Sequence, residues 1–222
     1  MGVQVPPLAP NKESKMSSIF YGEPKQKFVG NYREWNGTSL DESKYYTDLI
    51  YPHIDHALDH VTLDGLYMEF GVYTGRSLRH TAKRLPNKTI YGFDVFTTGL
   101  PESWHCVPQG MFSIPVPVFE EKNIELVVGL YDETCPTFPK SNVAYMHIDC
   151  DLYSSTKTVF DNFADYIVPG TVIVFDEYYN YGTYQDHEYK AFKELLEFRK
   201  LSCIPLGVVE TEAACPASFL IT

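Results

Sequence analysis

The stretch from residue 66 to residue 77 constrains the fold more than any other part of the chain. It reads Leu-Tyr-Met-Glu-Phe-Gly-Val-Tyr-Thr-Gly-Arg-Ser: an apolar run reaches a carboxylate, and two glycines precede a helix-compatible segment. In an α/β sheet such a turn lies at the carboxyl edge of a strand, where glycines let the backbone approach a ligand and the next helix offers unpaired N–H groups. Glycines with this spacing also occur in purely structural turns, so the turn alone leaves both interpretations open.

The composition narrows the class of protein. A chain of 222 residues with 44% hydrophobic and 21% charged residues is typical of one globular domain with a sizeable core. Its formal net charge of −11 argues against a nucleic-acid partner and favours a small molecule. No apolar run is long enough to span a membrane, and residues 1–15 lack the apolar core of a signal peptide, so we expect a cytoplasmic protein without a membrane partner. Five scattered cysteines without a Cys-x-x-Cys pair indicate reduced structural thiols.

Strand-like and helix-like segments alternate along most of the chain. The first expected strand ends near Glu69, and later strands are expected at residues 89–94, 123–128, 142–148, 171–175, 203–209 and 217–222. Amphipathic helices are expected at residues 46–61, 77–85, 154–167 and 186–201. This alternation predicts an α/β fold: a Rossmann-like, doubly wound, mostly parallel sheet of seven strands with helices on both faces.

The N-terminal region does not follow this alternation. Residues 1–15 are expected to form a loose arm, and the aromatic-rich residues 16–37 to form either a lid over a cleft or an irregular segment packed on the core. We therefore divide the chain into an N-terminal arm and possible lid at residues 1–40 and a main domain at residues 41–222. The long connection at residues 95–121 is expected to contain a short helix or a loop that faces the substrate.

The helix before the first strand carries a start signal and three histidines. Ser39 and Glu42 have the spacing of a capping box, which predicts the start of the helix. His53, His56 and His60 lie along it, and the spacing of the last two would place them on one face. Since no zinc motif accompanies them, we expect a solvated or capping set.

Four of the first five expected strands end in acidic residues, namely Glu69, Asp94, Asp149 (with Asp151) and the pair Asp176-Glu177. The carboxyl ends of parallel strands meet at one edge of a sheet, which is where open α/β folds bind ligands. Asp94 follows Glu69 by 25 residues, near the distance at which nucleotide-binding folds place an acid for ribose hydroxyls. The turn is therefore expected to hold a cofactor that contains ribose.

Crowded carboxylates repel one another and must protonate, stay solvated or share a cation. Asp149, Asp176 and Glu177 offer the oxygen ligands that Mg²⁺ prefers, with positions left for water and a substrate. The alternative is that some of these acids cap helices or pair with lysine and arginine.

Four segments resemble the successive motifs of one enzyme class. They are Glu-Phe-Gly-Val-Tyr-Thr-Gly-Arg-Ser at 69–77, Tyr-Gly-Phe-Asp-Val-Phe at 91–96 followed by Gly-Leu-Pro-Glu-Ser-Trp at 99–104, His-Ile-Asp-Cys-Asp-Leu-Tyr-Ser-Ser-Thr at 147–156, and Pro-Gly-Thr-Val-Ile-Val-Phe-Asp-Glu-Tyr at 169–178. The chain resembles the class I S-adenosylmethionine-dependent methyltransferases over roughly residues 65–195. More narrowly, it is similar to the macrocin O-methyltransferase type, which methylates sugar hydroxyls of natural products and uses Mg²⁺.

The resemblance implies a role for each matched position. The turn would hold the methionine half of the cofactor through Glu69, Gly71, Tyr73, Gly75 and Ser77. Asp94 would bind the ribose hydroxyls, and Gly129, Leu130 and Tyr131 would lie by the adenine. Asp149 would contact the cofactor and also ligate Mg²⁺ beside the acceptor hydroxyl, with Asp176 and Glu177 completing the metal site. Relatives commonly have Asp-Asp-Tyr where this chain has Asp176-Glu177-Tyr178.

These parts are consistent with methyl transfer. An in-line displacement from a sulfonium depends largely on alignment of the hydroxyl oxygen with the methyl carbon. Coordination to Mg²⁺ would lower the pKa of the hydroxyl, and Asp149 or else His147 would accept its proton. A histidine two residues before the end of a strand is also commonly a structural core residue, so His147 keeps both interpretations.

We therefore expect an O-methyltransferase that uses S-adenosylmethionine and Mg²⁺ and acts on a hydroxyl of a small, sugar-containing or polyhydroxylated molecule. A nicotinamide-dependent oxidoreductase is the first alternative, although the turn lacks the Gly-x-Gly-x-x-Gly form and no Tyr-x-x-x-Lys set is present. A non-catalytic cofactor-binding module is the second, against which the acids at 149, 176 and 177 argue. The sequence leaves the oligomeric state open, including a homo-oligomer.

Overall fold

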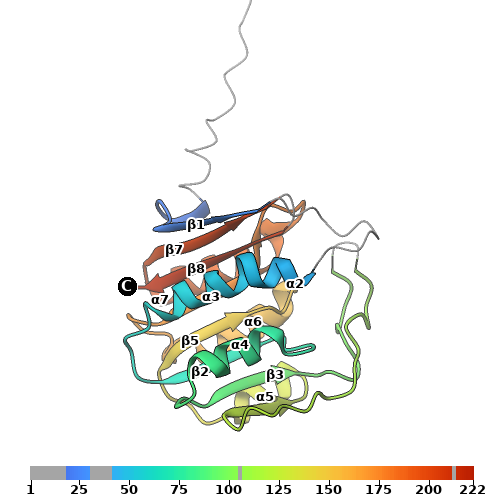
Figure 1. Cartoon of the computed structure of the whole chain (residues 1–222). Helices are drawn as coiled ribbons and strands as arrows, with labels where there is room; N and C mark the ends of the chain where they lie inside the picture. Colours follow the sequence, from blue (N-terminus) through green and yellow to red (C-terminus); the bar gives the residue numbers. More distant parts are fainter. Residues whose placement is uncertain (1–18, 31–41, 105–106, 212–213) are drawn as a thin grey trace, which may run out of the picture.

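The central sheet contains eight strands in the described part of the chain, which covers residues 19–30, 42–104, 107–211 and 214–222 of this computed structural model. Their order is β1-β7-β8-β6-β5-β2-β3-β4 (Figure 1). Strand β8 runs antiparallel to both neighbours, and all other adjacent pairs are parallel. The strands are β1 (Gln26–Val29), β2 (Leu66–Phe70), β3 (Ile90–Asp94), β4 (Ile124–Val128), β5 (Val143–Ile148), β6 (Val172–Tyr179), β7 (Cys203–Glu210) and β8 (Cys215–Ile221).

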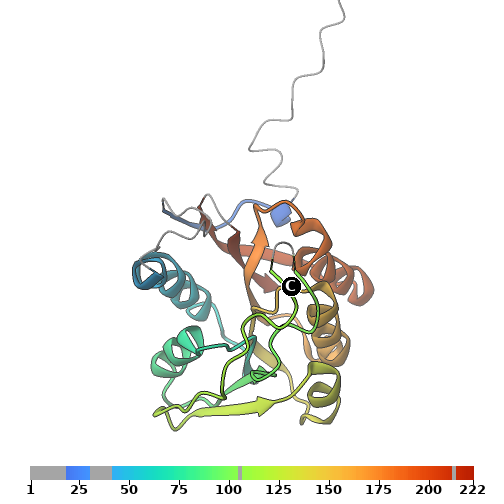
Figure 2. The ribbon, with the colours of Figure 1, turned by 90° about the vertical axis from the view of Figure 1, so that its right-hand side faces the viewer.

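Helices cover both faces of the sheet. Helices α3 and α4 lie on one face, and α5, α6 and α7 lie on the other (Figure 2). The helices are α2 (Glu42–Tyr45), the π-helix η1 (Tyr46–Ile50), α3 (Tyr51–Leu58), α4 (Arg76–Arg84), α5 (Tyr131–Thr137), α6 (Tyr153–Phe163), α7 (Glu188–Arg199) and the short 3-10 turns η2 (Ala164–Tyr166) and η3 (Tyr184–Asp186). The predicted α/β fold, a mostly parallel sheet between two helical layers, is confirmed.

The central strands are buried on both faces, which explains their sequences. Every residue of β5, Val-Ala-Tyr-Met-His-Ile, is buried, as expected for a parallel strand between two layers of helices. On one face Met68 and Ile148 pack among aromatic side chains of α6 and α7. On the other face Leu78 and Val174 pack with residues of α3. The sheet thus places the carboxyl ends of β2 to β6 at one common edge.

Two elements differ from the expected set. Strand β1 is an eighth strand, parallel to β7 at the edge of the sheet, and its mostly exposed Gln-Lys-Phe-Val sequence has too few apolar residues to give a strand signal. Helix α5 was also not expected, because it is short and contains Pro136. The acids Asp176 and Glu177 lie inside β6, which continues to Tyr179 rather than ending at residue 175.

A π-turn interrupts the helix that precedes β2. Pro52 has no N–H to donate to the carbonyl of Asp48, which removes one α-helical hydrogen bond. The N–H of Tyr51 instead donates to the carbonyl of Tyr46, five residues earlier, as in a π-helix. The predicted cap residue Ser39 lies outside the described residues.

Each of the three histidines makes a polar contact with another residue of the protein. His53 is fully buried against the sheet, where its Nε2 lies 2.9 Å from Ser218 Oγ. The Nε2 of His56 lies 3.3 Å from the carbonyl oxygen of Leu206. The expectation of a solvated or capping set is therefore wrong for His53, since the helix turns this position toward β7 and β8.

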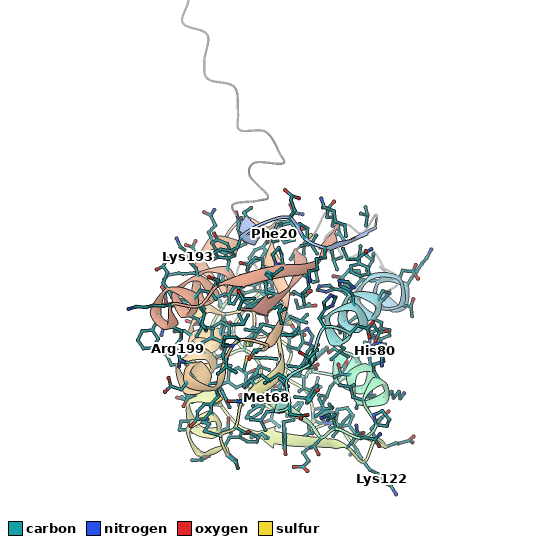
Figure 3. All side chains as sticks on the ribbon, turned by 90° about the vertical axis from the view of Figure 1, so that its left-hand side faces the viewer. Phe20, Met68, His80, Lys122, Lys193 and Arg199 are labelled. Atoms are coloured by element: carbon teal, nitrogen blue, oxygen red, sulfur yellow. The ribbon has the colours of Figure 1, made fainter. Side chains whose placement is uncertain are left out.

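Residues 19–30 pack on the core. Phe20 is fully buried at the end of the molecule near β1 (Figure 3) and makes an edge contact with Tyr179, with ring centroids 4.8 Å apart. Of the two interpretations of the aromatic-rich region, the packed segment therefore holds for residues 19–30. The division of the chain at residue 40 falls outside the described residues and stays a prediction.

The cysteines and the helices can be compared with the expectations of reduced thiols and of no membrane span. Four cysteines are free and buried, namely Cys135, Cys150, Cys203 and Cys215, whereas Cys106 lies outside the described residues. Among the described helices, none has the length and apolar character needed to cross a membrane.

We predict that Phe20→Ala destabilises the protein by about 3–5 kcal/mol, because it removes a fully buried aromatic side chain from the core. The control is Phe198→Ala, at a position that is 78% exposed, which should change the free energy of unfolding by less than about 0.5 kcal/mol. Urea unfolding measures both changes. Equal, small effects would show that residues 19–30 do not stabilise the domain.

Candidate active site

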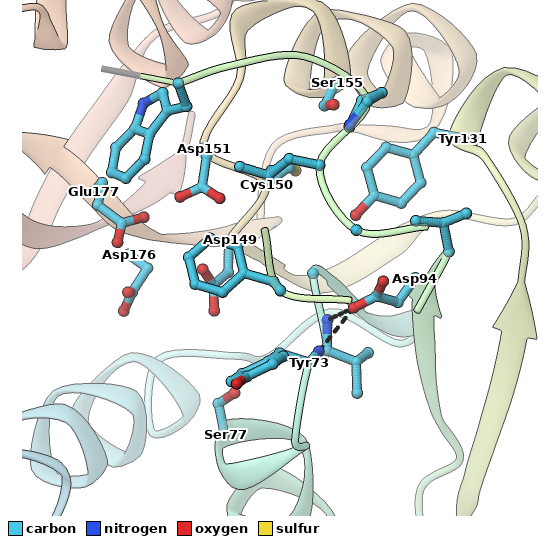
Figure 4. A pocket seen from close by; sticks show the side chains of 18 of the residues that line it. Tyr73, Ser77, Asp94, Tyr131, Asp149, Cys150, Asp151, Ser155, Asp176 and Glu177 are labelled. Atoms are coloured by element: carbon cyan, nitrogen blue, oxygen red, sulfur yellow. Dashed lines mark hydrogen bonds between the residues drawn. The ribbon is translucent and has the colours of Figure 1, made fainter. Parts of the chain in front are cut away.

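A cavity of about 720 Å³ lies at the carboxyl edge of the sheet. The turn after β2, the ends of β3, β5 and β6, and the loop at residues 95–112 contribute to its walls. Figure 4 shows Asp94 and Tyr131 on one side of it and four acids on the other. The predicted site residues that line the cavity are Gly71, Tyr73, Ser77, Asp94, Gly129, Leu130, Tyr131, Asp149, Asp176 and Glu177. The predicted residues that do not line it are Glu69, Gly75 and His147.

The glycine turn lies directly against the end of β5. Gly71 has φ of +92°, and a Cβ at this position would lie 1.6 Å from the carbonyl oxygen of Asp149. Gly75 has φ of +75°, and a Cβ there would lie 2.4 Å from the Phe119 ring. Both positions thus require glycine for conformation and for space. The turn after β2 therefore lies beside Asp149, the first of the acids in the loop that follows β5.

Asp94 holds the turn in place. Its Oδ2 accepts hydrogen bonds from the N–H groups of Val72, at 2.9 Å, and Tyr73, at 2.7 Å (Figure 4). Its Oδ1 accepts a third from the N–H of Phe96, at 2.8 Å. A carboxylate has about four lone-pair sites, so capacity remains for a ligand hydroxyl. Asp94 therefore orders the turn and still faces the cavity.

A buried network lies beneath the turn. Glu69 Oε1 accepts a hydrogen bond from Ser77 Oγ at 2.9 Å, and Glu69 Oε2 lies 3.0 Å from His147 Nδ1. Burial by itself lowers the pKa of His147, but the hydrogen bond to Glu69 and the charges of Glu69 and Asp176 raise the pKa above its usual value. Glu69 reaches the cavity only through Ser77. His147 is turned toward Glu69, so the geometry favours Asp149 over His147 as the acceptor of a substrate proton.

Acids from the loop after β5 and from β6 gather on the other side of the cavity. Carboxylate oxygens of Asp149, Asp151 and Glu177 all lie within 4.8 Å of one another. Asp176 lines the same cavity but is not part of this close group. Two of the predicted metal ligands, Asp149 and Glu177, belong to this close group, which also contains Asp151. The predicted ligand set with Asp176 stays a prediction. In the sequence, Asp151 stands two residues after Asp149. The alternation of side chains along a strand could not place its carboxylate, because Asp151 lies in the loop that follows β5.

Burial and mutual repulsion change the acidity of this group. Burial, followed by the charges of Asp176 and Asp151, raises the pKa of Asp149 well above its usual value. Burial and the same two charges raise the pKa of Glu177 in the same direction. Burial, with the charges of Asp176 and Asp94, raises the pKa of Asp151 to about 7. Without a counter-charge, these side chains therefore bind protons more tightly than free carboxyl groups do.

The group fits a hard divalent cation. Three carboxylates supply oxygen ligands, which Mg²⁺ prefers over nitrogen or sulfur. The Oε2 atom of Glu177 is buried and has no hydrogen-bond partner among the described residues. A buried acceptor without a donor is costly, and a cation would satisfy it.

Aromatic side chains complete the walls. Tyr45 and Tyr46 come from the π-turn region, and Trp104 and Phe112 come from the long loop after β3. The sequence predicts that residues 95–121 contain a short helix or a loop that faces the substrate. Their described residues form no helix, and several of them line the cavity. Its contribution to the walls is consistent with a segment that faces a substrate.

Comparisons with known proteins agree with the fold. CalS11, a calicheamicin methyltransferase, is similar in structure, with a TM-score of 0.62 and 20% identity over 96% of this chain and 93% of that chain. An apo structure of CalS11, described as a TDP-rhamnose 3'-O-methyltransferase, gives a TM-score of 0.55 and 23% identity over 77% and 78%. The O-methyltransferase NovP gives a TM-score of 0.56 and 17% identity over 77% of each chain. A comparison with curated protein sequences found no significant match.

The sequence profile of a family described as "Methyltransferase domain" matches residues 68–178, half of the chain. The chain belongs to this methyltransferase family. Its Rossmann-like fold is that of the two structural neighbours, and the protein is an S-adenosylmethionine-dependent methyltransferase. The nicotinamide-dependent oxidoreductase is thereby set aside.

We predict that Asp151→Asn becomes more stable relative to the wild type as the pH rises from about 5 to about 8 in EDTA. The folded-state pKa of Asp151 of about 7 lies above its unfolded value of about 3.9, so the wild type loses stability as its carboxyl ionises in the folded state. Asparagine does not titrate, and the difference should grow by at least about 1 kcal/mol. Urea unfolding at each pH measures it, and a constant difference would contradict the raised pKa.

Proposed function

We propose that the protein transfers the methyl group of S-adenosylmethionine to a hydroxyl of a small, sugar-containing or polyhydroxylated molecule, with help from Mg²⁺. The observation that carries the proposal is the position of the close carboxylate group, Asp149, Asp151 and Glu177, in the same cavity as the glycine turn. A methyltransferase that acted on a strongly nucleophilic atom would have little use for such a group. The names of CalS11 and NovP, both O-methyltransferases, agree with the proposal.

The cofactor would occupy the side of the cavity formed by the turn and by Asp94. S-adenosylmethionine supplies a methyl group on a positively charged sulfur. The backbone of Gly71 to Thr74 lines this side, and Ser77 adds a hydroxyl held by Glu69. The remaining lone pair of Asp94 would accept from a ribose hydroxyl, and Leu130 and Tyr131 would flank the adenine.

The acceptor would occupy the side with the acids and the aromatic walls. A divalent cation bound by Asp149, Asp151 and Glu177 would lower the pKa of the acceptor hydroxyl. Asp149 connects this group to the turn, because its carbonyl oxygen lies against Gly71 while its carboxylate faces the cavity. It is thereby suited to orient the hydroxyl toward the methyl group and to accept its proton.

The aromatic walls suit a polyhydroxylated ring. Flat aromatic faces pack against the C–H face of a sugar, while tyrosine hydroxyls exchange hydrogen bonds with its hydroxyls. Tyr46 is held in position by Arg76, whose guanidinium carbon lies 5.1 Å from the ring centroid. A rigid wall of this kind would orient a ring at low entropic cost.

Calorimetry and methyl-transfer assays test the proposal. We expect the protein to bind S-adenosylmethionine and to transfer its tritiated methyl group to TDP-rhamnose or to a neutral glycoside from a panel of sugars. We also expect EDTA to lower the rate and Mg²⁺ to restore it. Absence of cofactor binding at millimolar concentration would overturn the proposal, and full activity in EDTA would remove the metal from it.

We predict that Asp149→Ala lowers the rate of methyl transfer by about a hundredfold or more, because it removes a proton acceptor and a cation ligand together. Binding of S-adenosylmethionine should survive, since Asp94 and the turn backbone are unchanged. The control is Asp161→Ala on α6, where the side chain is exposed and pairs with Lys157. A rate close to that of the wild type for Asp149→Ala would refute the role given to this carboxylate.

A further inference from the structure

The loop between β5 and α6 carries two of the three close carboxylates, Asp149 and Asp151, and must hold both in position. Strand β2 holds its beginning, because the N–H of Asp149 donates to the carbonyl of Phe70 at 2.8 Å. Two residues later Asp151 is left-handed, with φ of +62°. This conformation costs a non-glycine residue about 1–2 kcal/mol, and it persists only where the surroundings hold the chain.

Glu188 contacts the backbone in the middle of this loop. It lies in the first turn of α7 and is 0% exposed. Its Oε1 accepts a hydrogen bond at 3.3 Å from the N–H of Cys150, the residue between the two carboxylates. Its Oε2 is also buried and has no hydrogen-bond partner among the described residues. Glu188 therefore ties α7 to the backbone that presents Asp149 and Asp151.

The charge of Glu188 needs its own explanation. A glutamine would offer the same acceptor oxygen to the N–H of Cys150 without the cost of burying a charge. Glu188 instead adds a carboxyl group, and burial, followed by the charges of Asp151 and Asp176, raises its pKa well above the usual value. The repulsion between Glu188 and these acids is unfavourable in the absence of a cation, and a cation bound to the group would reduce it. A negative charge on Glu188 would therefore favour the binding of a cation by the neighbouring acids.

We propose that Glu188 is a positioning residue for the divalent-cation site. Its hydrogen bond to Cys150 keeps Asp149 and Asp151 facing the same part of the cavity, and its charge increases the affinity for the ion. This role rests on the proposed metal site of Asp149, Asp151 and Glu177. Glu188 itself does not line the cavity, and it acts through the loop and through its charge.

Binding of Mn²⁺ to the full-length protein, measured by calorimetry, tests the role without an activity assay. We expect Glu188→Ala to weaken Mn²⁺ binding by at least about tenfold, because the loop loses its hold and the site loses a charge. Glu188→Gln should weaken it by about threefold, since the acceptor oxygen remains and only the charge is lost. The matched control is Glu197→Ala, an exposed position on the same helix, which should bind Mn²⁺ as the wild type does.

The outcomes separate this role from the proposed function. Wild-type protein that binds no Mn²⁺ would overturn the metal site and the role of Glu188 with it. Wild-type affinity in folded Glu188→Ala would overturn the role of Glu188 and leave the metal site standing. Circular dichroism and S-adenosylmethionine binding report folding. If Glu188→Ala fails to fold, Glu188→Gln decides: a loss of about threefold supports the role of the charge, and unchanged affinity overturns it.

Discussion

The close approach of Gly71 to the carbonyl of Asp149 is the constraint on which the rest of the site depends. No side chain fits between them, since a Cβ on Gly71 would lie 1.6 Å from that oxygen. The contact joins the turn after β2 to the end of β5, so the two halves of the cavity are built on adjacent strands of one rigid sheet. A methyl donor held by the turn and a hydroxyl held by the acids would therefore meet at a separation that the sheet determines and no loop has to set.

The close packing of buried carboxylates in the cavity lowers the stability of the fold, and apolar burial in the rest of the sheet offsets this loss. Asp149, Asp151 and Glu177 are forced together, and burial raises the pKa of each of them. Such a group is tolerated because aromatic clusters on both faces of the sheet bury large apolar areas, for example around Phe175 and Phe192. The strongly packed scaffold thus compensates for the local instability of the site.

Sequence patterns predicted the sheet and the cavity edge because both follow from periodic burial and strand direction. Continuous apolar runs identified β5, and the acids after the strands identified the edge where they meet. Other features depend on contacts that no local pattern records. The short polar strand β1 forms only because β7 offers a free edge, and His53 is buried only because its helix packs against β7 and β8. Asp151 joins the close carboxylate group from a left-handed backbone conformation, with φ of +62°, and its spacing from Asp149 alone does not predict that conformation.

The methyltransferase family could be identified from the sequence, whereas the substrate could not. The matched segment, residues 68–178, contains the turn, Asp94 and the clustered acids, which serve a reaction common to many substrates. Tyr45 and Tyr46 lie before that segment, on a helix whose π-turn is caused by Pro52. Selection for a particular acceptor can act on such a wall without disturbing the contact between Gly71 and Asp149. Under the proposed function, the chemistry would therefore be tied to the sheet, whereas part of the specificity would lie in elements that can change independently of it.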